Sequence, residues 1–599
     1  MDAVPDSHSP VEVYRARIAE RSAEAAVCQR QHVWLGYARL ALVVSGIILA
    51  WLSFHSHVIS RWWLLLPCLV FVLIARRHSA VLGRCETAQR AIASFERGIA
   101  RAEDRWRELP SRGKQVDTSA SLFAEDLDLF SAGGMFDLLC TARTSAAEDV
   151  LASWLLGSAE RDVILLRQAA IAELRGCLAL RESLASCEGP DVAKLDIASL
   201  AGWASASQAL IPGWLRWLAP VLMLITVAAF AYYLATNAAL ALVLAVIVDA
   251  AITFPLQKRT QAIFTGAERA SRSLRLAAAM IGILERESFG AALSGELQQR
   301  FRSKTGSASA ALAKLSALSQ RIEYRANYIV KILDAPLMYS VQLAGAVQAW
   351  RRMHGEALES WLRALADFEA LVSLATYSFE HPQDTFPELV HGEPLFEAEQ
   401  IGHPLIPAAT CVRNDVMLGG DARLLLVSGS NMSGKSTLLR AVGLNTVLAM
   451  MGAPVRCAKL RLTPLHVGAS IQVHDSLEQG RSRFYAEVLR LRDIVGMSES
   501  DGPVLFLLDE LFGGTNSSDR LAGAEGIGRA LLASGAIGML STHDLALTEI
   551  GHAGELALRN VHFEDRIENG KMLFDFRLRD GVVTHRNGLE LMRLVGLKV

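Results

Sequence analysis

The 599-residue sequence has little charge and no excess of either sign. Charged residues make up 20% of the chain, and 60 Lys and Arg face 62 Asp and Glu, for a net charge of −2. A near-neutral chain lacks the overall positive field that draws many proteins to nucleic acids. The eight cysteines include no C-x-x-C pair. Neither a disulfide framework nor a zinc site is therefore indicated, and a reducing cytosolic setting fits.

Hydrophobic residues make up 51% of the chain, which is high for an ordinary soluble enzyme. No charged residue occurs in Leu40–Ile59 or in Trp62–Ala75, and Trp217–Gln257 has only Asp249. These runs predict four membrane-spanning helices in two hairpins, the second turning at Thr236-Asn237. Tryptophans at the edges of the runs favour this interpretation over buried hairpins in a soluble core. The first run is not expected to be a cleavable signal peptide, because no A-x-A-like site follows it.

Arginine and lysine flank the apolar runs on one side only. In the loops between the two helices of each hairpin, Arg61 is the only positive residue. The opposite flanks of the hairpins are rich in positive charge, with Arg15, Arg17, Arg21, Arg30, Arg76, Arg77, Arg84, Lys258 and Arg259. This asymmetry predicts a multi-pass membrane protein with both termini and residues 80–210 in the cytoplasm. For Asp249, a helix-packing or water-exposed position is favoured over an ion path of a transporter, because the sequence offers no partner.

The rest of the chain is predicted to be helical up to about residue 400 and α/β after that. Residues 79–110, 262–300 and 304–350 have helical periodicity with solvated charged faces. Five prolines between 382 and 407 mark a change of composition. Short apolar strands then alternate with helices, at Leu424–Val427, Val504–Leu508 and Ile537–Leu540. This order predicts a doubly wound parallel sheet.

The α/β region contains a phosphate-binding loop. Its first strand leads into Gly429-Ser430-Asn431-Met432-Ser433-Gly434-Lys435-Ser436, which matches G-x-x-x-x-G-K-[ST]. Backbone N–H groups and the N-terminus of the next helix bind phosphate oxygens in such a loop. Lys435 is expected at the β- and γ-phosphates and Ser436 at Mg²⁺. The predicted nucleotide-binding residues here are Gly429, Asn431, Met432, Ser433, Gly434, Lys435, Ser436 and Thr437.

Two further strands end in side chains that suit the same site. Val504–Leu508 is followed by Asp509, a candidate Mg²⁺ ligand, and by Glu510, a candidate for polarising water. Gly538–Thr542 is followed by His543, at the strand end where α/β sheets bind ligands. The alternatives, solvated acids and a structural histidine, are less favoured because these residues follow apolar strands beside a phosphate loop. Glu510 and His543 are therefore the predicted catalytic residues.

These motifs resemble those of the MutS family of DNA mismatch repair ATPases. The phosphate loop is similar, with Ser430 where the family usually has Pro. Asp509–Asn516 resembles the family's DE-x-x-x-GT segment, with Gly513 in place of a common Arg. Asp475–Glu487 resembles the signature segment, with Arg483 in place of the usual Thr. Three shorter matches are Ser541-Thr542-His543-Asp544 with the T-H switch, and His403-Pro404-Leu405 and Asn414-Asp415 with the motifs around the adenine.

The resemblance is strong over 382–599, weak over 120–380 and absent from the first 118 residues. Nothing in the chain resembles the family's mismatch-reading α/β domain or its β-rich clamp. The predicted fold is α followed by α/β, with an ABC-type P-loop ATPase domain at the carboxyl terminus. The predicted divisions are 1–32 N-terminal segment, 33–78 transmembrane hairpin, 79–117 helical linker, 118–212 MutS-like helical core, 213–257 second transmembrane hairpin, 258–380 lever-like helices and 381–599 ATPase domain.

The resemblance implies a homodimeric ATPase that uses ATP and Mg²⁺ and closes when ATP binds. Lys435, Ser436, Asp509 and Glu510 would hold and hydrolyse ATP, with His403 and Asn414 near the adenine. Ser482 would cap the γ-phosphate of the facing subunit, with a helix N-cap as its alternative role. Residues 580–599 are expected to form a turn and a helix that support dimerisation.

Two functions are open from the sequence. By resemblance, the first is a membrane-anchored clamp that binds double-stranded DNA in mismatch repair or recombination. The second is a membrane-tethered ATPase that remodels a protein or lipid partner without DNA. In both, the ATPase and helical domains are expected in the cytoplasm. A transporter of the ABC type is disfavoured, because the four short spans contain no polar pathway residues.

Overall fold

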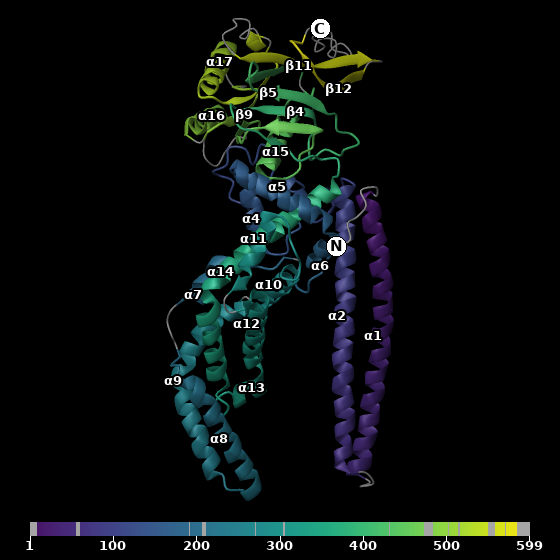
Figure 1. The fold of residues 1–599 in the computed structure, drawn as a ribbon, viewed down its shortest axis with the longest axis vertical. Coiled ribbons are helices and arrows are strands. Elements are labelled where there is room, and N and C mark those ends of the chain that lie inside the picture. Colours follow the sequence, from purple (N-terminus) through teal and green to yellow (C-terminus); the bar gives the residue numbers. More distant parts are fainter. Residues whose placement is uncertain are drawn as a thin grey trace.

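The molecule is elongated, with an α/β domain at one end, a helical middle and two long hairpins pointing away from it (Figure 1). This computed structural model describes residues 9–55, 60–190, 192–206, 211–269, 271–303, 306–430, 432–472, 483–500, 502–512, 516–544, 546–548, 557–568 and 571–583. The predicted order, helices first and a mixed α/β domain last, is confirmed. Both hairpins leave the same side of the molecule and end at a similar level (Figure 1).

Hairpin 1 consists of α1 (Pro10–Phe54) and α2 (Leu65–Ala102), with the short helix η1 (Arg61–Leu64) before α2. A capping box formed by Ser9 and Glu12 starts α1, and Pro10 occupies its first turn, where a missing N–H costs nothing. The two helices pack along each other as an antiparallel pair (Figure 1). Far from the body, their large apolar side chains are exposed, as for Trp62 and Trp63.

Hairpin 2 consists of α8 (Leu215–Thr236) and α9 (Leu240–Arg269). Asn237 ends α8 in the left-handed conformation with a φ of 57°, so the predicted turn at Thr236-Asn237 is confirmed. Asp249 is only 1% exposed and accepts a 2.6 Å hydrogen bond from Thr226. This carboxyl group therefore joins the two helices of the hairpin. Within the described residues, four helices, those of the two hairpins, are long and apolar enough to cross a membrane.

The middle of the molecule is a helical core built around one long helix. That helix, α14 (Tyr339–Glu380), has 42 residues and runs from hairpin 2 to the α/β domain (Figure 1). The helices around it are α3 (Met135–Leu139), α4 (Ser145–Leu156), α5 (Arg161–Gly176), α6 (Leu178–Ala185), α7 (Ile197–Ser205), α10 (Ser271–Leu284), α11 (Ala292–Arg300) and α12 (Ala308–Glu323). Smaller elements are η2 (Trp106–Glu108), β1 (Arg302–Ser303), β2 (Gly306–Ser307), η3 (Tyr324–Ala326) and α13 (Tyr328–Leu333).

The long helices expected over 262–300 and 304–350 are interrupted. The second is folded back on itself, because α12 and α14 are antiparallel neighbours joined through α13 (Figure 1). Asp334 supports the reversal, since its carboxylate accepts hydrogen bonds from the N–H (2.7 Å) and hydroxyl (2.6 Å) of Ser340. Met338 has a φ of 47° at the same turn. Helical periodicity does not reveal such a turn, because the apolar pattern continues through it.

The α/β domain contains a six-stranded sheet in the order β12-β11-β6-β10-β9-β8. All neighbouring pairs are parallel except β11 with β12, so the predicted parallel sheet is confirmed with one antiparallel edge. Its strands are β6 (Leu424–Ser428), β8 (His466–Ser470), β9 (Val504–Asp509), β10 (Ile537–Thr542), β11 (Leu558–Glu568) and β12 (Lys571–Asp580). A second sheet, in the order β3-β7-β4-β5, contains β3 (Glu388–Leu389), β4 (Phe396–Ile401), β5 (Asn414–Leu418) and β7 (Lys459–Leu462).

Helices cover both faces of the large sheet. Alternate strand residues fall into two different cores: Leu425, Leu505 and Leu507 belong to one, and Leu424 and Phe506 to the other. The first core continues into α15 (Lys435–Met451) and the helical middle, while the second lies under α16 (Arg483–Ser500) and α17 (Ser517–Ala533). Burial on both faces explains why the strands read as unbroken apolar runs.

Candidate functional site

The carboxyl ends of three adjacent parallel strands define the site. Strand β10 lies between β6 and β9, and the register pairs Ser428 with Thr542 and Ser541 with Asp509. The phosphate loop leaves the end of β6, and the predicted catalytic residues leave the ends of β9 and β10. Their convergence therefore follows directly from the strand order.

The phosphate loop turns tightly between β6 and α15. Gly429 has a φ of 152°, and a Cβ atom there would lie 2.8 Å from the hydroxyl of Ser433. Gly434 has a φ of 106° at the N-cap of α15, a conformation that glycine adopts without steric cost. The hydroxyls of Ser430 and Ser433 are buried and make no hydrogen bond with a described residue. Unused donors around a glycine turn at a helix N-terminus suit phosphate oxygens.

Three side chains from different elements meet beside this loop. The ammonium of Lys435 donates hydrogen bonds to the carbonyls of Gly429 (3.0 Å) and Ser430 (2.9 Å). It also lies 3.4 Å from Oε1 of Glu510, and Nδ1 of His543 lies 3.4 Å from the same oxygen. Lys435 is buried, whereas the side chains of Glu510 and His543 are 35% and 50% exposed. Within the cluster, Glu510 and His543 are therefore accessible to solvent, whereas Lys435 is enclosed.

The turn after β9 is strained in a way that orients the two acids. Glu510 has a φ of 46° and Phe512 a φ of 58°, values that cost roughly 1–3 kcal/mol each for a non-glycine residue. The hydroxyl of Ser541 donates to Asp509, and the N–H of Glu510 donates to the carbonyl of Ser541 (3.2 Å). The N–H of Phe512 donates to Glu487 of α16 (3.0 Å). Neighbouring elements therefore hold this turn in place.

The two residues predicted near the adenine are placed by local contacts. His403 is half-buried, and its Nδ1 accepts from the N–H of Leu405 (3.2 Å). Burial lowers the pKa of His403 to about 4, with a smaller contribution from nearby arginines, so the ring is neutral at physiological pH. The amide of Asn414 donates to the carbonyl of Phe576 (3.0 Å) and accepts from the N–H of Leu578 (2.8 Å). Asn414 therefore fixes β12, and the ring of Phe576 lies against Gly434.

The other predicted site residues lie along the loop and the first turn of α15. Met432 is 84% exposed, Ser436 is half-buried and Thr437 is exposed. Asn431 and Ser482 lie outside the described residues, as do Gly513 and residues 584–599. Within the described part of the chain, no group of three or more His, Cys, Asp or Glu side chains suits a metal ion. The hydroxyl of Ser436 and the carboxylate of Asp509 are oxygen ligands of the type that Mg²⁺ takes beside nucleotide phosphates.

Three residues of the site were not singled out from the sequence. Ser541 and Glu487 belong to segments that resemble MutS motifs, but which atoms they contact depends on strand register and helix packing. Phe576 gave no signal, because it comes from a β-hairpin far along the chain. Only the pairing of β11 with β6 brings that hairpin beside the phosphate loop.

Comparisons with known proteins agree with this geometry. Residues 425–598 match the family model for MutS domain V. The carboxyl-terminal domain belongs to the MutS family. MutS domain V is an ATPase domain of the ABC type, so the chain contains an ATP-binding ATPase domain.

Three curated relatives are MutS proteins. DNA mismatch repair protein MutS of Geobacillus thermodenitrificans (strain NG80-2) is 31% identical over 255 residues, which are 40% of this chain and 27% of the relative. The protein of that name in Geobacillus kaustophilus (strain HTA426) is 28% identical over 293 residues, 47% of this chain and 31% of the relative. DNA mismatch repair protein MutS 2 of Halobacterium salinarum (strain ATCC 700922 / JCM 11081 / NRC-1) is 33% identical over 250 residues, which are 40% of this chain and 28% of the relative. The chain thus spans less than a third of the length of these relatives.

Proposed function

We propose that this protein is a membrane-anchored ATPase in which ATP-dependent pairing of two MutS-type domains moves the two apolar hairpins. The observation that carries the proposal is that one chain combines a nucleotide site with two apolar hairpins. Lys435, Glu510 and His543 converge at a phosphate loop. The same chain extends two helical hairpins with long apolar stretches in one direction (Figure 1).

The side chains divide the work of hydrolysis. Lys435 and the loop N–H groups bind the β- and γ-phosphates, and Ser436 and Asp509 hold Mg²⁺. Glu510 orients and polarises the attacking water, and His543, on the same carboxylate oxygen, responds to the γ-phosphate. Gly429, Asn431, Met432, Ser433, Gly434 and Thr437 complete the phosphate cradle, with His403 and Asn414 on the adenine side. Ser482 caps the γ-phosphate across the dimer, so that ATP favours the closed state because it touches both subunits.

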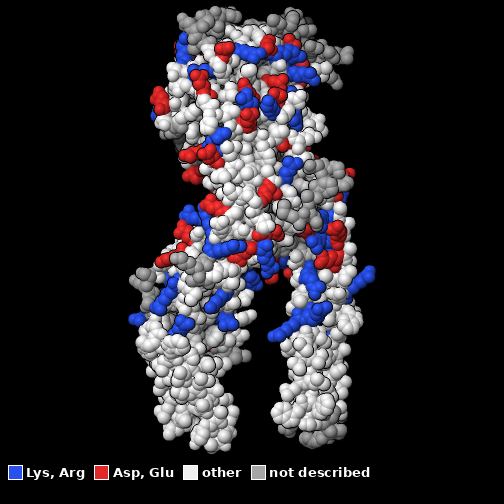
Figure 2. All heavy atoms as spheres, viewed as in Figure 1, with Lys and Arg blue, Asp and Glu red and all other residues white. Residues whose placement is uncertain are grey.

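Charge distribution supports membrane anchoring. Figure 2 shows hairpin ends without charged side chains on the visible face, and Lys and Arg where the hairpins join the body. Four helices of this length and composition suit a bilayer core of about 30 Å. Positive charge at one end of each hairpin orients the ATPase and helical domains toward the cytoplasm.

Helix α14 is the connection between the two ends. Its first half packs on hairpin 2 through Val341, Ala344 and Val347, which share a buried cluster with Leu215 and Phe264. Its last residue, Glu380, forms a buried ion pair with Arg101 of hairpin 1 (2.7 Å). A movement of the ATPase domain would therefore be passed to both hairpins.

The enzymatic part is tested with the Glu510→Gln variant of the full-length protein in detergent. ATP should still bind, hydrolysis should fall at least 100-fold, and a closed dimer should accumulate with Mg²⁺ and ATP. Lys435→Ala should lose ATP binding itself. Normal turnover by Glu510→Gln would contradict the role given to this carboxylate.

The membrane part is tested by washing membranes that contain the protein with alkaline carbonate. A spanning protein stays in the pellet, because its helices are in contact with the lipid chains. Release of the full-length protein into the wash would contradict anchoring by spanning helices.

A second candidate function is a DNA clamp, favoured by the names of the relatives, which are DNA mismatch repair proteins. The mixed positive and negative surface of the α/β domain in Figure 2 does not favour it. Binding of duplex DNA at increasing salt distinguishes the two, because neutralised phosphates give a steep salt dependence. Absence of binding at low salt would remove the DNA candidate and leave a protein or lipid partner.

A further inference from the structure

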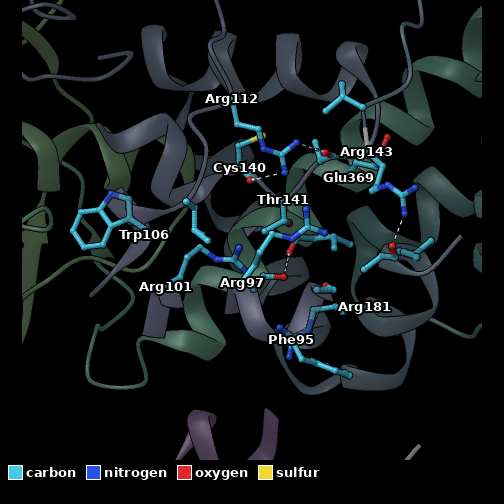
Figure 3. A pocket seen from close by; sticks show the side chains of 18 of the residues that line it. Phe95, Arg97, Arg101, Trp106, Arg112, Cys140, Thr141, Arg143, Arg181 and Glu369 are labelled. Atoms are coloured by element: carbon cyan, nitrogen blue, oxygen red, sulfur yellow. Dashed lines mark hydrogen bonds between the residues drawn. The ribbon is translucent and has the colours of Figure 1, made fainter. Parts of the chain in front are cut away.

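A cavity of about 330 Å³ lies where hairpin 1, the helical core and α14 meet (Figure 3). We call it the junction cavity. Its walls come from α2, the segment after η2, the core around Cys140–Arg143, α6 and α14. None of the residues predicted to bind ATP lines it. Its volume is at the lower end of the range for small-molecule sites.

Arginines dominate the charge of the junction cavity. Five arginines and three carboxyl groups line it: Arg97, Arg101, Arg112, Arg143 and Arg181 against Asp137, Glu182 and Glu369. The carboxyl groups are engaged by other partners. Asp137 accepts from the backbone N–H of Arg112, Glu182 binds Arg21, and Glu369 accepts from the backbone N–H of Arg143. From just outside the lining, Glu380 pairs with Arg101 (2.7 Å) and Glu148 with Arg112 (3.5 Å). With these two acids and Arg21 counted, six arginines face five carboxyl groups, a formal excess of one positive charge.

Arg181 is the strongest indication that this cavity is an anion site. Arg181 is only 6% exposed. Its Nη2 donates to the carbonyl of Arg175 (3.2 Å), and its guanidinium lies 4.5 Å from the ring centre of Phe379. Its Nε is buried without a hydrogen-bond partner, and no carboxylate of a described residue forms an ion pair with it. A buried cation with an unused donor is costly unless an anion compensates it.

The other walls indicate what the anion carries. Phe95 and Trp106 are buried aromatic residues of the lining, and Figure 3 shows them on the same cavity as Arg97, Arg101 and Arg181. Guanidinium groups bind phosphate through paired N–H donors, and aromatic faces accept an apolar or planar group. We propose that the junction cavity binds a small organic phosphate, with its phosphate at Arg97 and Arg181 and its organic part against Phe95 and Trp106.

A soluble phosphate ester fits the position better than a lipid. Helix α2 carries the cavity residue Arg101 about 36 Å beyond Arg77, at 1.5 Å per residue, and Arg77 follows the apolar run of hairpin 1. A phospholipid headgroup of the same bilayer does not reach that far. The occupant is therefore a compact metabolite from the cytoplasmic side.

Phenyl phosphate is the probe, because it combines an aromatic ring with a phosphate and offers no adenine to the ATP site. Calorimetric titration is done on the full-length protein in detergent, with and without the Lys435→Ala change that disables the phosphate loop. Phenyl phosphate should bind both proteins alike and more tightly than inorganic phosphate. The Arg181→Gln and Arg97→Gln variants should weaken binding at least tenfold. Arg90→Gln, which changes a half-buried arginine of α2 that pairs with Glu86 outside the cavity lining, should leave the affinity unchanged.

Three results would overturn the proposal. They are no binding to the wild-type protein at millimolar phenyl phosphate, equal affinity in folded Arg181→Gln and Arg97→Gln, and loss of all binding in Lys435→Ala. Melting curves establish that each variant is folded. A lipid occupant is tested with the protein in nanodiscs that contain phosphatidic acid, where Arg181→Gln should not change binding of this lipid. If Arg181→Gln weakens phosphatidic acid binding and phenyl phosphate does not bind, the occupant is a lipid and not a metabolite.

Discussion

At the scale of single residues, the ATPase site depends on a serine that no motif marks as catalytic. The hydroxyl of Ser541 donates to Asp509, and its carbonyl accepts the N–H of the strained residue Glu510. Ser541 therefore sets the direction of both acids at the end of β9. A residue in this position affects the chemistry through the groups it orients rather than by touching the substrate.

Replacing Ser541 with Ala should slow hydrolysis while leaving ATP binding almost intact. The expected fall in kcat is about tenfold, typical for loss of a partner that orients a metal ligand, with a larger Mg²⁺ requirement. Steady-state turnover and the Kd for ATP measure the two effects separately. Ser534→Ala is the control, because Ser534 lies at the carboxyl end of α17 and its hydroxyl donates a hydrogen bond to Ser498. Equal loss of turnover in both variants would mean a general packing defect.

A second residue-scale prediction concerns pH. Glu369 on α14 is buried between Arg143 and Thr144, and burial raises its pKa from 4.5 to about 7. Between these values the unfolded chain loses the proton and the folded protein keeps it. The free energy of unfolding should therefore fall as the pH rises from 4.5 to 7, by up to about 3 kcal/mol. Glu369→Gln should flatten the rise of Tm toward acidic pH, and Glu359→Gln, an exposed change on the same helix, should not.

The sequence predicts the positions of residues well where they depend on local order and poorly where they depend on strand register. Gly429, Lys435 and Asp509 sit in contiguous motifs, so their positions follow from a strand, a turn and a helix. The link of Phe576 to Asn414 joins residues 162 apart and requires the whole sheet. Arg181 and the junction cavity were not predicted either, because several segments far apart in the sequence create that environment.

At the scale of elements, one buried ion pair joins hairpin 1 to the end of α14. Arg101 donates two hydrogen bonds to Glu380, of 2.8 and 2.7 Å, and the hydroxyl of Tyr14 donates to the same carboxylate (3.2 Å). Burial and the negative charge of Glu380 raise the pKa of Tyr14, so it acts as a donor at all physiological pH values. The first turns of α1, the last turn of α2 and the last turn of α14 thus meet at one carboxylate.

Glu380→Gln should loosen this joint severely, because it leaves Arg101 buried without its counter-ion. The expected loss of stability is about 3–5 kcal/mol, seen as a lower Tm of the helical part. Glu380→Leu with Arg101→Met should be less damaging than Glu380→Gln alone. Glu86→Gln, which breaks the exposed pair with Arg90, should cost less than about 1 kcal/mol. A Glu380→Gln protein as stable as the wild type would show that the pair does not hold the hairpin.

Elements were predicted where composition alone marks their ends. The turn of hairpin 2 follows from two apolar runs with Asn237 between them, and the strands β6, β9 and β10 follow from short apolar runs. The other strands of the α/β domain were not predicted. The reversal between α12 and α14 was missed, because the helical period is the same on both sides of Asp334. Side-chain contacts such as those of Asp334 with Ser340 decide that turn.

At the scale of the whole molecule, the ATPase domain and hairpin 2 are at opposite ends of α14, so a link between them requires a continuous packed path. From Tyr377 the path continues through Asp384 (2.6 Å) to Arg456, and the N–H of Arg456 donates to Asn445 of α15 (2.6 Å). Helix α15 begins at Lys435 of the phosphate loop. Helix α15 and these buried polar contacts therefore connect the nucleotide site to α14, which contacts both hairpins.

If this path transmits the ATP state, the ends of hairpin 2 in the two subunits of a dimer should change their separation. A spin label at Asn237→Cys, the turn of hairpin 2, reports that distance in a background with Cys68→Ser, which removes the exposed cysteine. In the Glu510→Gln protein, Mg²⁺ with ATP should shift the distance distribution measured by pulsed electron resonance. Adding Lys435→Ala should abolish the shift, and the protein without Asn237→Cys gives the background signal. A closed dimer with an unchanged distance would mean that the ATPase domain moves independently of the hairpins.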